Sequence, residues 1–295
     1  MTSDSSARPP LVSVILATYN WTSVLRHAIR TVLWQSFADF ELLAIGDACT
    51  DDTAEVVASF GDPRIRWHNL PENSGNQAIP NNKGMELARG EYVAYMHQDD
   101  LWMPDHLAVL VEALQSHDVP LAYTLLLEVA PPPDLFRRLI GLPNQQPYPR
   151  TFGANHVYLR TPAVLHRTDV GRAVGGWRNW QELHVAPFVD FMQRVISPDE
   201  QLVSVLEMTV IKFHSDQRRN SYIEQRCDEQ AEFIQRIESE PDFRYRELLR
   251  AANDQALGNY ETRLIPETPV GAQPGWEIDQ LRRVRGLPSS SSNAN

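Results

Sequence analysis

Two adjacent carboxylates, Asp99 and Asp100, follow directly on an apolar run of strand character at residues 92–96. Carboxylates at the carboxyl end of a strand lie where open α/β sheets bind their ligands. Hard oxygen ligands at such a place suit Mg²⁺ or Mn²⁺ carrying a diphosphate. The alternative is a solvated acidic turn ahead of a helix, and Asp51-Asp52 forms a second such pair.

The composition is that of a globular protein with a full core. The 295 residues suffice for one large domain or two small ones. Hydrophobic residues make up 42% of the chain and charged residues 22%, which is the range of soluble globular proteins. The net charge of −11 argues against a nucleic-acid partner, because binding to a phosphate backbone depends on clustered Lys and Arg. It is compatible with a small phosphorylated ligand that a metal ion neutralises.

Cysteine usage and the N-terminus favour a cytoplasmic protein. The only cysteines, Cys49 and Cys227, have the spacing of neither a metal site nor a disulfide framework. The first six residues lack the basic segment and apolar core of a signal peptide. No apolar run approaches the ~20 residues that span a bilayer, so we expect no transmembrane segment. Peripheral association with the inner membrane face stays open.

Apolar patterns predict that strands and helices alternate along the first half of the chain. Continuous or alternating apolar runs predict strands at residues 11–17, 40–45, 64–68, 92–96 and 121–129. Helical spacing predicts helices around residues 24–33, 54–58, 80–89 and 107–114. This alternation indicates an α/β fold with a doubly wound, mostly parallel sheet.

The turn after the first strand, residues 17–20, contains no glycine. The dinucleotide-binding fold needs a glycine-rich turn there, and the P-loop pattern is absent as well. A nicotinamide or flavin oxidoreductase and a P-loop NTPase are therefore disfavoured. Phosphate must be held by another device, and a metal ion on Asp99 is available.

The order of motifs in the first half resembles that of family 2 glycosyltransferases, which have the GT-A fold. The motifs are Val12–Asn20, Gln35-Ser36-Phe37, Gly46–Thr53, Asn73-Ser74-Gly75, Asn82-Lys83-Gly84, Ala88–Tyr92 and His97–Pro104. A weaker match at Gly175-Gly176-Trp177, Asp190 and His214 extends the resemblance to about residue 215. The shared order and spacing, rather than any single motif, carry the resemblance.

The resemblance implies where a nucleotide binds. Residues after the first strand line the base pocket, and the acidic residue after the second strand contacts the base or the ribose. A carboxylate suits the second role because it accepts paired hydrogen bonds from a donor edge such as an imide. The implied nucleotide-binding residues are Thr18, Tyr19, Asn20, Asp47, Gly75, Asn82, His97 and Gln98. For Asp47, the alternative is a helix cap.

The metal motif departs from the usual Asp-X-Asp of the family, because the chain has His97-Gln98-Asp99. The resemblance assigns Asp99 to the metal, Mn²⁺ or Mg²⁺, and leaves the ribose contact to Gln98 or His97. His214 resembles the histidine that the family places against the metal or the diphosphate; its alternative role is structural. Asp100 is expected to cap the following helix or to face the acceptor.

Members of this family invert the anomeric carbon by single displacement, with an Asp as general base. Asp190 lies where the family has Glu-Asp at a helix start, although Val189 replaces the preceding acid. Glu182 is the rival base and lies among tryptophans that either stack on a sugar or pack in the core.

The resemblance also suggests how the chain is divided. We expect a disordered lead-in at residues 1–10, a nucleotide-sugar-binding half at 11–130 and an acceptor-binding, catalytic half at 131–220, a C-terminal extension of mixed strands and helices. Strand character is expected at 156–159 and 201–213. A helical segment at 221–265 and a mobile tail at 266–295 follow.

The leading hypothesis is an inverting, metal-assisted glycosyltransferase that moves a sugar from a nucleoside diphosphate donor, UDP by family preference, to an unidentified hydroxyl acceptor. A sugar nucleotidyltransferase is the second hypothesis, but it needs a glycine- and lysine-rich first loop. A non-catalytic nucleotide-sugar-binding protein is the third. The expected partners include no nucleic acid, and a homodimer is left open.

Overall fold

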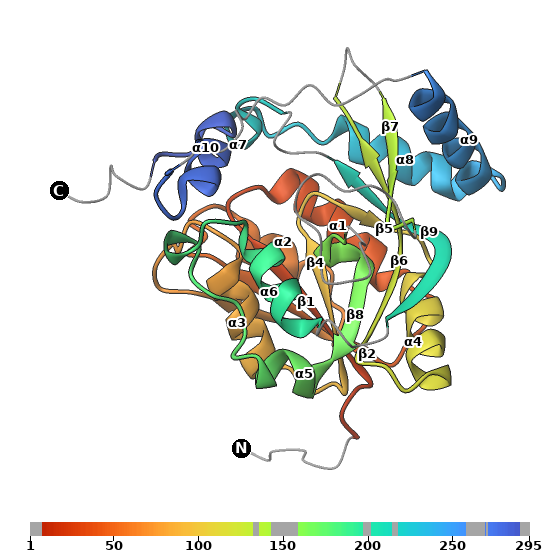
Figure 1. Ribbon diagram of the computed structural model, residues 1–295, viewed down its shortest axis with the longest axis horizontal. Coiled ribbons are helices and arrows are strands. Elements are labelled where there is room, and N and C mark those ends of the chain that lie inside the picture. The colour runs from red at the N-terminus through yellow and green to blue at the C-terminus, as the bar shows by residue number, and fades with distance from the viewer. Residues whose placement is uncertain are drawn as a thin grey trace.

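Figure 1 shows the computed structural model of the chain. It describes residues 8–131, 136–142, 159–196, 202–213, 218–257, 269 and 271–289. Within these residues the strands form one sheet in the order β3-β2-β1-β4-β8-β6-β9-β5, and β7 pairs with β6. Helices cover both faces of this sheet.

The first half of the sheet is parallel throughout, because each strand is followed by a crossover helix. Its strands are β1 (Val12–Thr18), β2 (Phe40–Gly46), β3 (Ile65–Asn69) and β4 (Tyr92–His97). The helices between them are α1 (Thr22–Leu33), α2 (Thr53–Ala58) and α3 (Ala78–Leu87). The parallel register aligns the carboxyl ends of β1, β2 and β4 at one edge of the sheet.

The second half extends the sheet with mixed pairing: β6 runs antiparallel to β7 and β8 but parallel to β9. Its strands are β5 (Leu101–Trp102), β6 (Leu121–Val129), β7 (Arg137–Ile140), β8 (Val164–Arg167) and β9 (Val203–Phe213). Its helical elements are α4 (His106–Ser116), η1 (Thr161–Ala163), α5 (Thr168–Ala173), η2 (Trp180–Glu182) and α6 (Pro187–Val195). Four helices follow: α7 (Ser221–Glu224), α8 (Asp228–Ser239), α9 (Phe243–Ala256) and α10 (Trp276–Val284).

Alternating side chains of the central strands fill the two faces of the sheet. On one face, Val14 and Leu16 of β1 pack in a buried cluster with residues of α1 and α4. On the other face, Ile15 of β1 and Tyr95 of β4 pack with residues of α3 and α6. A third cluster joins β6 and β9 to α8 and α9.

The predicted fold class is confirmed, and the predicted strands of the first half agree with the observed ones within two residues. The predicted helical stretch at 221–265 contains α7, α8 and α9. The predicted strand at 156–159 lies outside the described residues except for Leu159.

The predicted mobile tail at 266–295 differs from the structure, because α10 lies within it. Ile278 of this helix is only 5% exposed and joins the cluster beneath α3 and α6. The glycines and prolines that flank this short helix conceal its apolar face in the sequence.

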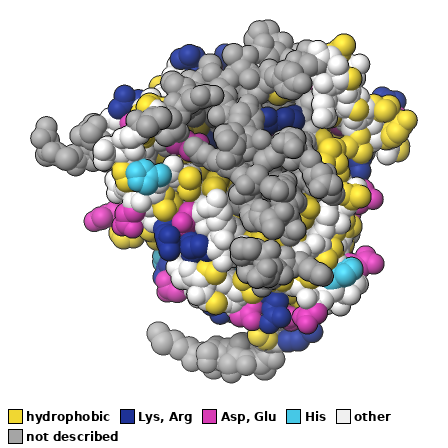
Figure 2. Space-filling view, viewed as in Figure 1, with side chains coloured by type: hydrophobic (Ala, Val, Ile, Leu, Met, Phe, Trp, Pro, Cys, Tyr) yellow, Lys and Arg dark blue, Asp and Glu magenta, His cyan; other side chains and the backbone are white. Residues whose placement is uncertain are grey.

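The surface carries exposed apolar side chains on α9 and on the residue that follows it, Leu257. Tyr245, Leu249 and Leu257 are 65%, 52% and 68% exposed, and apolar side chains gather over this helix in Figure 2. No helix in the described part of the chain combines the length and apolar character that crossing a bilayer requires.

A buried carboxylate ties the first half of the sheet together at the edge opposite the aligned carboxyl ends. Glu41 of β2 accepts hydrogen bonds from Ser13 Oγ (2.8 Å) and from the backbone N–H of Arg89 (3.0 Å). The guanidinium groups of Arg89 and Arg66 donate to its other oxygen at 2.8–3.0 Å. Burial alone would raise the pKa of Glu41, but these hydrogen bonds hold it below its usual value.

We therefore expect Glu41→Gln to lower the free energy of unfolding at pH 7 by about 1.5–3 kcal/mol, the contribution of hydrogen bonds to a charged group. The folded-state pKa lies below the unfolded value of 4.5, so the carboxylate stabilises the fold at neutral pH. This stabilisation is lost as the pH falls through the folded-state pKa. Urea unfolding of both proteins from pH 7 to pH 3 measures the difference, which should shrink below pH 4.5.

Glu86→Gln is the control, because its side chain is 67% exposed and, among the described residues, forms an ion pair only with Lys83 on the surface of α3. It should change the free energy of unfolding by less than about 1 kcal/mol. Equal stabilities of the two variants at pH 7 would contradict the role of Glu41.

Candidate functional site

A cavity of about 240 Å³ lies at the carboxyl ends of β1, β2 and β4. The sheet side of its wall includes seven residues that the sequence predicted. They are Thr18, Tyr19, Asp47, Gly75, His97, Gln98 and Asp99. Arg160, Lys212 and Tyr222 line it from the second half of the chain. The cavity therefore combines carboxylates, aromatic rings and cations at the edge where an open α/β sheet binds ligands.

Two predicted nucleotide-binding residues do not line this cavity. The Asn20 side chain exchanges hydrogen bonds with the backbone N–H (2.8 Å) and the hydroxyl (3.2 Å) of Thr50, which closes the turn after β1. Asn82 of α3 exchanges two hydrogen bonds of 2.8 Å with the backbone of Trp177. Both asparagines hold loops in place beside the cavity.

Gln98 joins the ends of two neighbouring strands. Its side-chain oxygen accepts hydrogen bonds from Thr18 Oγ1 (2.6 Å) and from the backbone N–H of Tyr19 (2.9 Å). Its side-chain nitrogen donates to the Tyr222 hydroxyl (2.9 Å). An amide suits this place because it accepts and donates at once, which a carboxylate cannot do.

His97 and Asp100 form a buried network with Lys212. His97 Nδ1 lies 3.0 Å from Asp100 Oδ2, and the Lys212 ammonium lies 3.3 Å from the same oxygen. Asp100 also accepts the backbone N–H of Phe213 at 3.1 Å. Burial would raise the pKa of Asp100, but Lys212 and His97 lower it below its ordinary value. The predicted helix cap is therefore wrong: Asp100 is fully buried and fixes the end of β9 instead.

Asp99 differs from its neighbour because its carboxylate accepts no hydrogen bond from the described residues, although it lines the cavity. One ligand atom from each of His97, Asp99 and Asp100 lies within 4.8 Å of the others. The carboxylate oxygens of this group suit Mn²⁺ or Mg²⁺. The residues fit a divalent cation, with Asp99 as the available ligand and Lys212 already neutralising part of the charge on Asp100.

Asp47 organises the loop that follows β3. Its two oxygens accept hydrogen bonds from Asn73 Nδ2, from the N–H and hydroxyl of Ser74 and from the N–H of Gly75, at 2.8–3.1 Å. Gly75 has a positive φ of 78°, which a residue without Cβ adopts readily. Burial raises the pKa of Asp47 despite these hydrogen bonds. Asp47 thus lies in the cavity wall, as the sequence predicted, but its oxygens accept hydrogen bonds from the protein itself.

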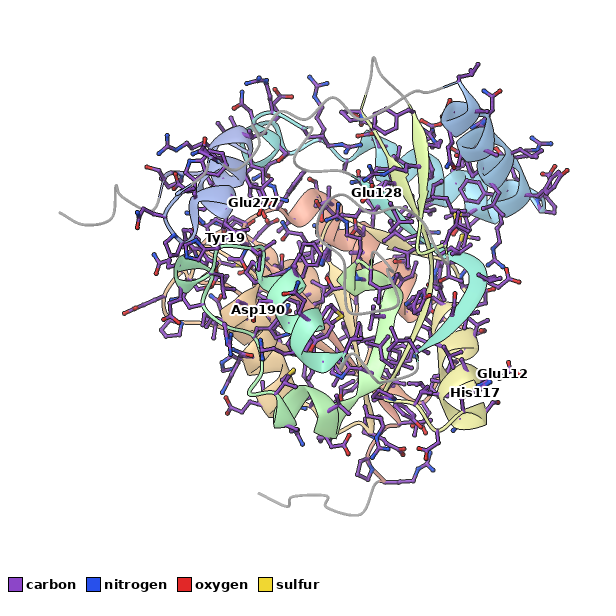
Figure 3. The ribbon with its side chains drawn as sticks, in the orientation of Figure 1. Tyr19, Glu112, His117, Glu128, Asp190 and Glu277 are labelled. Carbon is purple, nitrogen blue, oxygen red and sulfur yellow. The ribbon has the colours of Figure 1, made fainter. Side chains whose placement is uncertain are left out.

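The two predicted bases do not line the cavity. Asp190 is 8% exposed and accepts from Arg178 (3.2 Å) and, with two hydrogen bonds of 2.9 and 2.7 Å, from Arg194. Arg194 also donates to the carbonyls of Val174 and Gly176, so Asp190 anchors α6 to the turn before Trp177. Figure 3 shows Asp190 on α6. Glu182 is exposed on η2.

The tryptophans near Glu182 belong to the core rather than to a sugar-binding surface. Trp177 is 3% exposed and stacks on Phe191 with ring centroids 4.7 Å apart. Trp180 is 4% exposed, and its indole N–H donates to the Ser74 carbonyl at 3.0 Å. The remaining predicted site residue, His214, lies outside the described residues.

Several cavity residues had no role in the sequence prediction, among them Arg160, Tyr222 and Arg282. Tyr222 packs its ring against Trp21 and Tyr19, with centroids 5.1 and 6.1 Å away. Burial raises the pKa of its phenol to about 12. No local pattern in the sequence distinguishes these residues from the other arginines and tyrosines.

Comparisons with known proteins agree with this geometry. The model of glycosyl transferase family 2 matches residues 13–170. TuaG of Bacillus subtilis (strain 168), which is named as a teichuronic acid biosynthesis glycosyltransferase, is 35% identical over 117 residues, 39% of this chain and 46% of TuaG. WfgD of Escherichia coli, a UDP-Glc:alpha-D-GlcNAc-diphosphoundecaprenol beta-1,3-glucosyltransferase, is 29% identical over 113 residues, 38% of this chain and 44% of WfgD. The matched region spans less than half the length of each relative.

Solved structures share the fold. TarS of S. aureus (residues 1–349) superposes with a TM-score of 0.56 and 18% identity, over 70% of this chain and 61% of TarS. The mannosyltransferase PcManGT of Pyrobaculum calidifontis, in complex with GDP-Man and Mn²⁺, superposes with a TM-score of 0.54 and 19% identity, over 86% of this chain and 73% of that protein. The chain therefore has the GT-A fold.

The contacts of Asp190 generate a stability prediction. We expect Asp190→Asn to lower the free energy of unfolding by about 3 kcal/mol, because it leaves Arg194, whose side chain is only 17% exposed, without its carboxylate. Asp242→Asn is the matched control: Asp242 pairs with Arg246 at the same i,i+4 spacing and 2.7 Å, but its side chain is 50% exposed. The control should lose less than about 1 kcal/mol. Chemical denaturation measures both, and a similar small loss in the two variants would refute the anchoring role.

Proposed function

Because the family match covers more than half of its 295 residues, the chain belongs to glycosyl transferase family 2, and we propose that it transfers a sugar from a nucleoside diphosphate to an acceptor hydroxyl. One observation carries the proposal. The Asp99 carboxylate faces the cavity at the carboxyl edge of the sheet, and Lys212 and Arg160 line the same cavity. An available acid for a cation, with fixed positive charges beside it, suits a diphosphate.

The donor we propose is a UDP-sugar. TarS has been solved with UDP-GlcNAc and with UDP, and the name of WfgD includes UDP-Glc. PcManGT was solved with GDP-Man, so a guanosine donor is the alternative on this fold. The ring of Tyr19 at the end of β1 offers a face for either base.

Asp99, with His97 beside it, is proposed to hold Mn²⁺ or Mg²⁺. When bound, such a cation stabilises the negative charge of the departing diphosphate as a Lewis acid. Lys212 contributes a fixed ammonium within 3.4 Å of His97 Nδ1. The protein's own cations therefore carry part of this stabilisation, and we expect donor binding to persist in weakened form without metal.

The acceptor hydroxyl must lose its proton as it attacks, and we propose that a carboxylate accepts it with inversion at the anomeric carbon. Asp190 and Glu182 are the two candidates. Pro187 and Phe188, at the start of the helix that carries Asp190, line the cavity. Asp190 can act as the general base only if the acceptor hydroxyl replaces one of its two arginine partners. Arg178, whose side chain is 58% exposed, is the partner that can leave.

The engaged state of Asp190 favours a second candidate function, a nucleotide-sugar-binding protein without transferase activity. Hydrolysis of UDP-sugars distinguishes the two functions. A transferase without an acceptor slowly transfers the sugar to water and releases UDP. Binding without any UDP release, with or without Mn²⁺, would favour the second function. We propose a cytoplasmic location for the protein in either case.

Binding of UDP to wild type and to Asp99→Asn, measured by calorimetry with and without Mn²⁺, tests the proposed function. Removal of a residue that hydrogen-bonds to a metal ligand lowers metal affinity by about 10–100-fold. Removal of Asp99, the proposed ligand itself, should therefore weaken Mn²⁺-dependent UDP binding by at least about 100-fold. Without Mn²⁺ the two proteins should bind UDP within about threefold of each other, because Asp99 acts through the metal.

Asp52→Asn serves as the control for Asp99→Asn, because Asp52 is an exposed acid in the loop after β2 and caps no helix through its side chain. It should bind UDP and Mn²⁺ as wild type does. Wild type that binds none of UDP, GDP and dTDP, or Asp99→Asn that keeps full Mn²⁺ dependence, would refute the proposed site.

A further inference from the structure

Helix α10 forms one wall of the cavity, although it lies far beyond the matched residues 13–170. Glu277, Ile278, Leu281 and Arg282 line the cavity from this helix. Figure 3 shows Glu277 and Tyr19 in the same region of the molecule, from opposite ends of the sequence. The cavity is therefore completed by a segment that the family match does not include.

The start of α10 is held in a defined position. The N–H of Gly275 donates to the Leu183 carbonyl at 2.7 Å. Gly275 has a φ of 80°, and a Cβ there would lie 3.0 Å from the ring of Trp180, so glycine permits the close approach. Trp180 in turn donates to Ser74, in the loop that Asp47 organises. The start of α10 is thus connected, through Trp180, to the loop that Asp47 organises.

The end of α10 is fixed through α7. The N–H of Asn220 donates to the Val284 carbonyl at 2.8 Å, and the N–H of Tyr222 donates to the Arg285 carbonyl at 3.1 Å. Tyr222 is bonded to Gln98 and packs on the rings at the end of β1. Both ends of α10 are therefore connected to the strand ends that form the cavity.

Arg282 brings a guanidinium into this wall. It is 8% exposed, its Nη1 donates to the Gly75 carbonyl at 2.6 Å and its Nε donates to the Pro288 carbonyl at 3.2 Å. Its Nη2 makes no hydrogen bond with the described residues, and the side chain lines the cavity. A guanidinium donor at the cavity wall that the protein does not use is available to a polar ligand.

The position of Arg282 distinguishes the nucleoside from the diphosphate. Arg282 lies beside Asp47 and Gly75 at the end of β2, whereas Asp99 follows β4. Since β1 separates β2 from β4, the two places are about 10 Å apart at the strand spacing of a sheet. Both oxygens of Asp47 accept hydrogen bonds from the loop at residues 73–75, and Arg282 beside them offers an N–H that the protein does not use.

We propose that Arg282 hydrogen-bonds an oxygen of the donor's nucleoside, and that α10 with Tyr222 forms the outer wall of the nucleoside pocket. This inference rests on the proposed function. It assigns to α10 the recognition of the nucleoside, which is the part of the donor that does not react.

Calorimetry on the full-length chain tests the role of Arg282, with UDP, uridine and inorganic pyrophosphate as probes. Arg282→Gln should bind UDP and uridine at least about tenfold more weakly, the loss expected for a hydrogen bond from a charged group. Pyrophosphate affinity should stay within about threefold of wild type, because Arg282 lies away from the phosphate end. Arg283→Gln is the matched control: it removes the same charge from the next residue, whose side chain is 56% exposed.

Thermal unfolding without ligand checks that each variant is folded. Should Arg282→Gln unfold, Arg282→Lys replaces it: a single ammonium retains the charge and one hydrogen bond to Gly75 but not the second donor, so UDP binding should still weaken.

Three outcomes would overturn the inference. Unchanged UDP affinity in folded Arg282 variants refutes it while leaving the proposed function intact. Equal losses for UDP and pyrophosphate refute the assignment to the nucleoside. Wild type that binds no nucleoside diphosphate refutes both this inference and the proposed function.

Discussion

Parallel pairing of β1 with both β2 and β4 is the constraint on which the site depends. The register places Thr18 opposite Gly46, and Ala17 opposite His97, so three strands end together. The sheet itself therefore brings together the residues that follow these strand ends. Gln98 then joins β1 to β4, and Asp47 joins β2 to the loop after β3. The proposed contacts of Tyr19 and Asp99 are built on this common edge, and Lys212 and Arg282 join the cavity from β9 and α10.

Charge at the site is balanced locally rather than by the chain as a whole. The protein carries a net charge of −11, yet Arg160, Lys212, Arg282 and Arg285 all line one cavity. Three carboxylates at the strand ends have different environments: Asp100 is paired with Lys212, Asp47 is bonded to backbone N–H groups and Asp99 faces the cavity. These environments, not the acidic composition, distinguish a structural acid from a ligand-binding one.

The local parts of the fold and site could be predicted from the sequence. Apolar runs predict the central strands, and Asp99 follows from its place after one of them. The i,i+4 spacing of Asp190 and Arg194 on a predicted helix already indicates the ion pair that the structure shows, a signal that the resemblance to Glu-Asp motifs obscured. Arg282 and Tyr222 could not be predicted, because their positions depend on how distant segments pack, and no period or motif records that packing.

The contribution of α10 to the cavity has a consequence for synthesis on the ribosome. The strands that end at the cavity, β1, β2 and β4, are complete by residue 97, but the opposite wall includes residues 277–287. Since segments fold as they emerge during translation, the sheet can assemble well before its ligand pocket is enclosed. A nascent chain would therefore expose the open strand edge, with Asp99 already in place, until α10 left the exit tunnel.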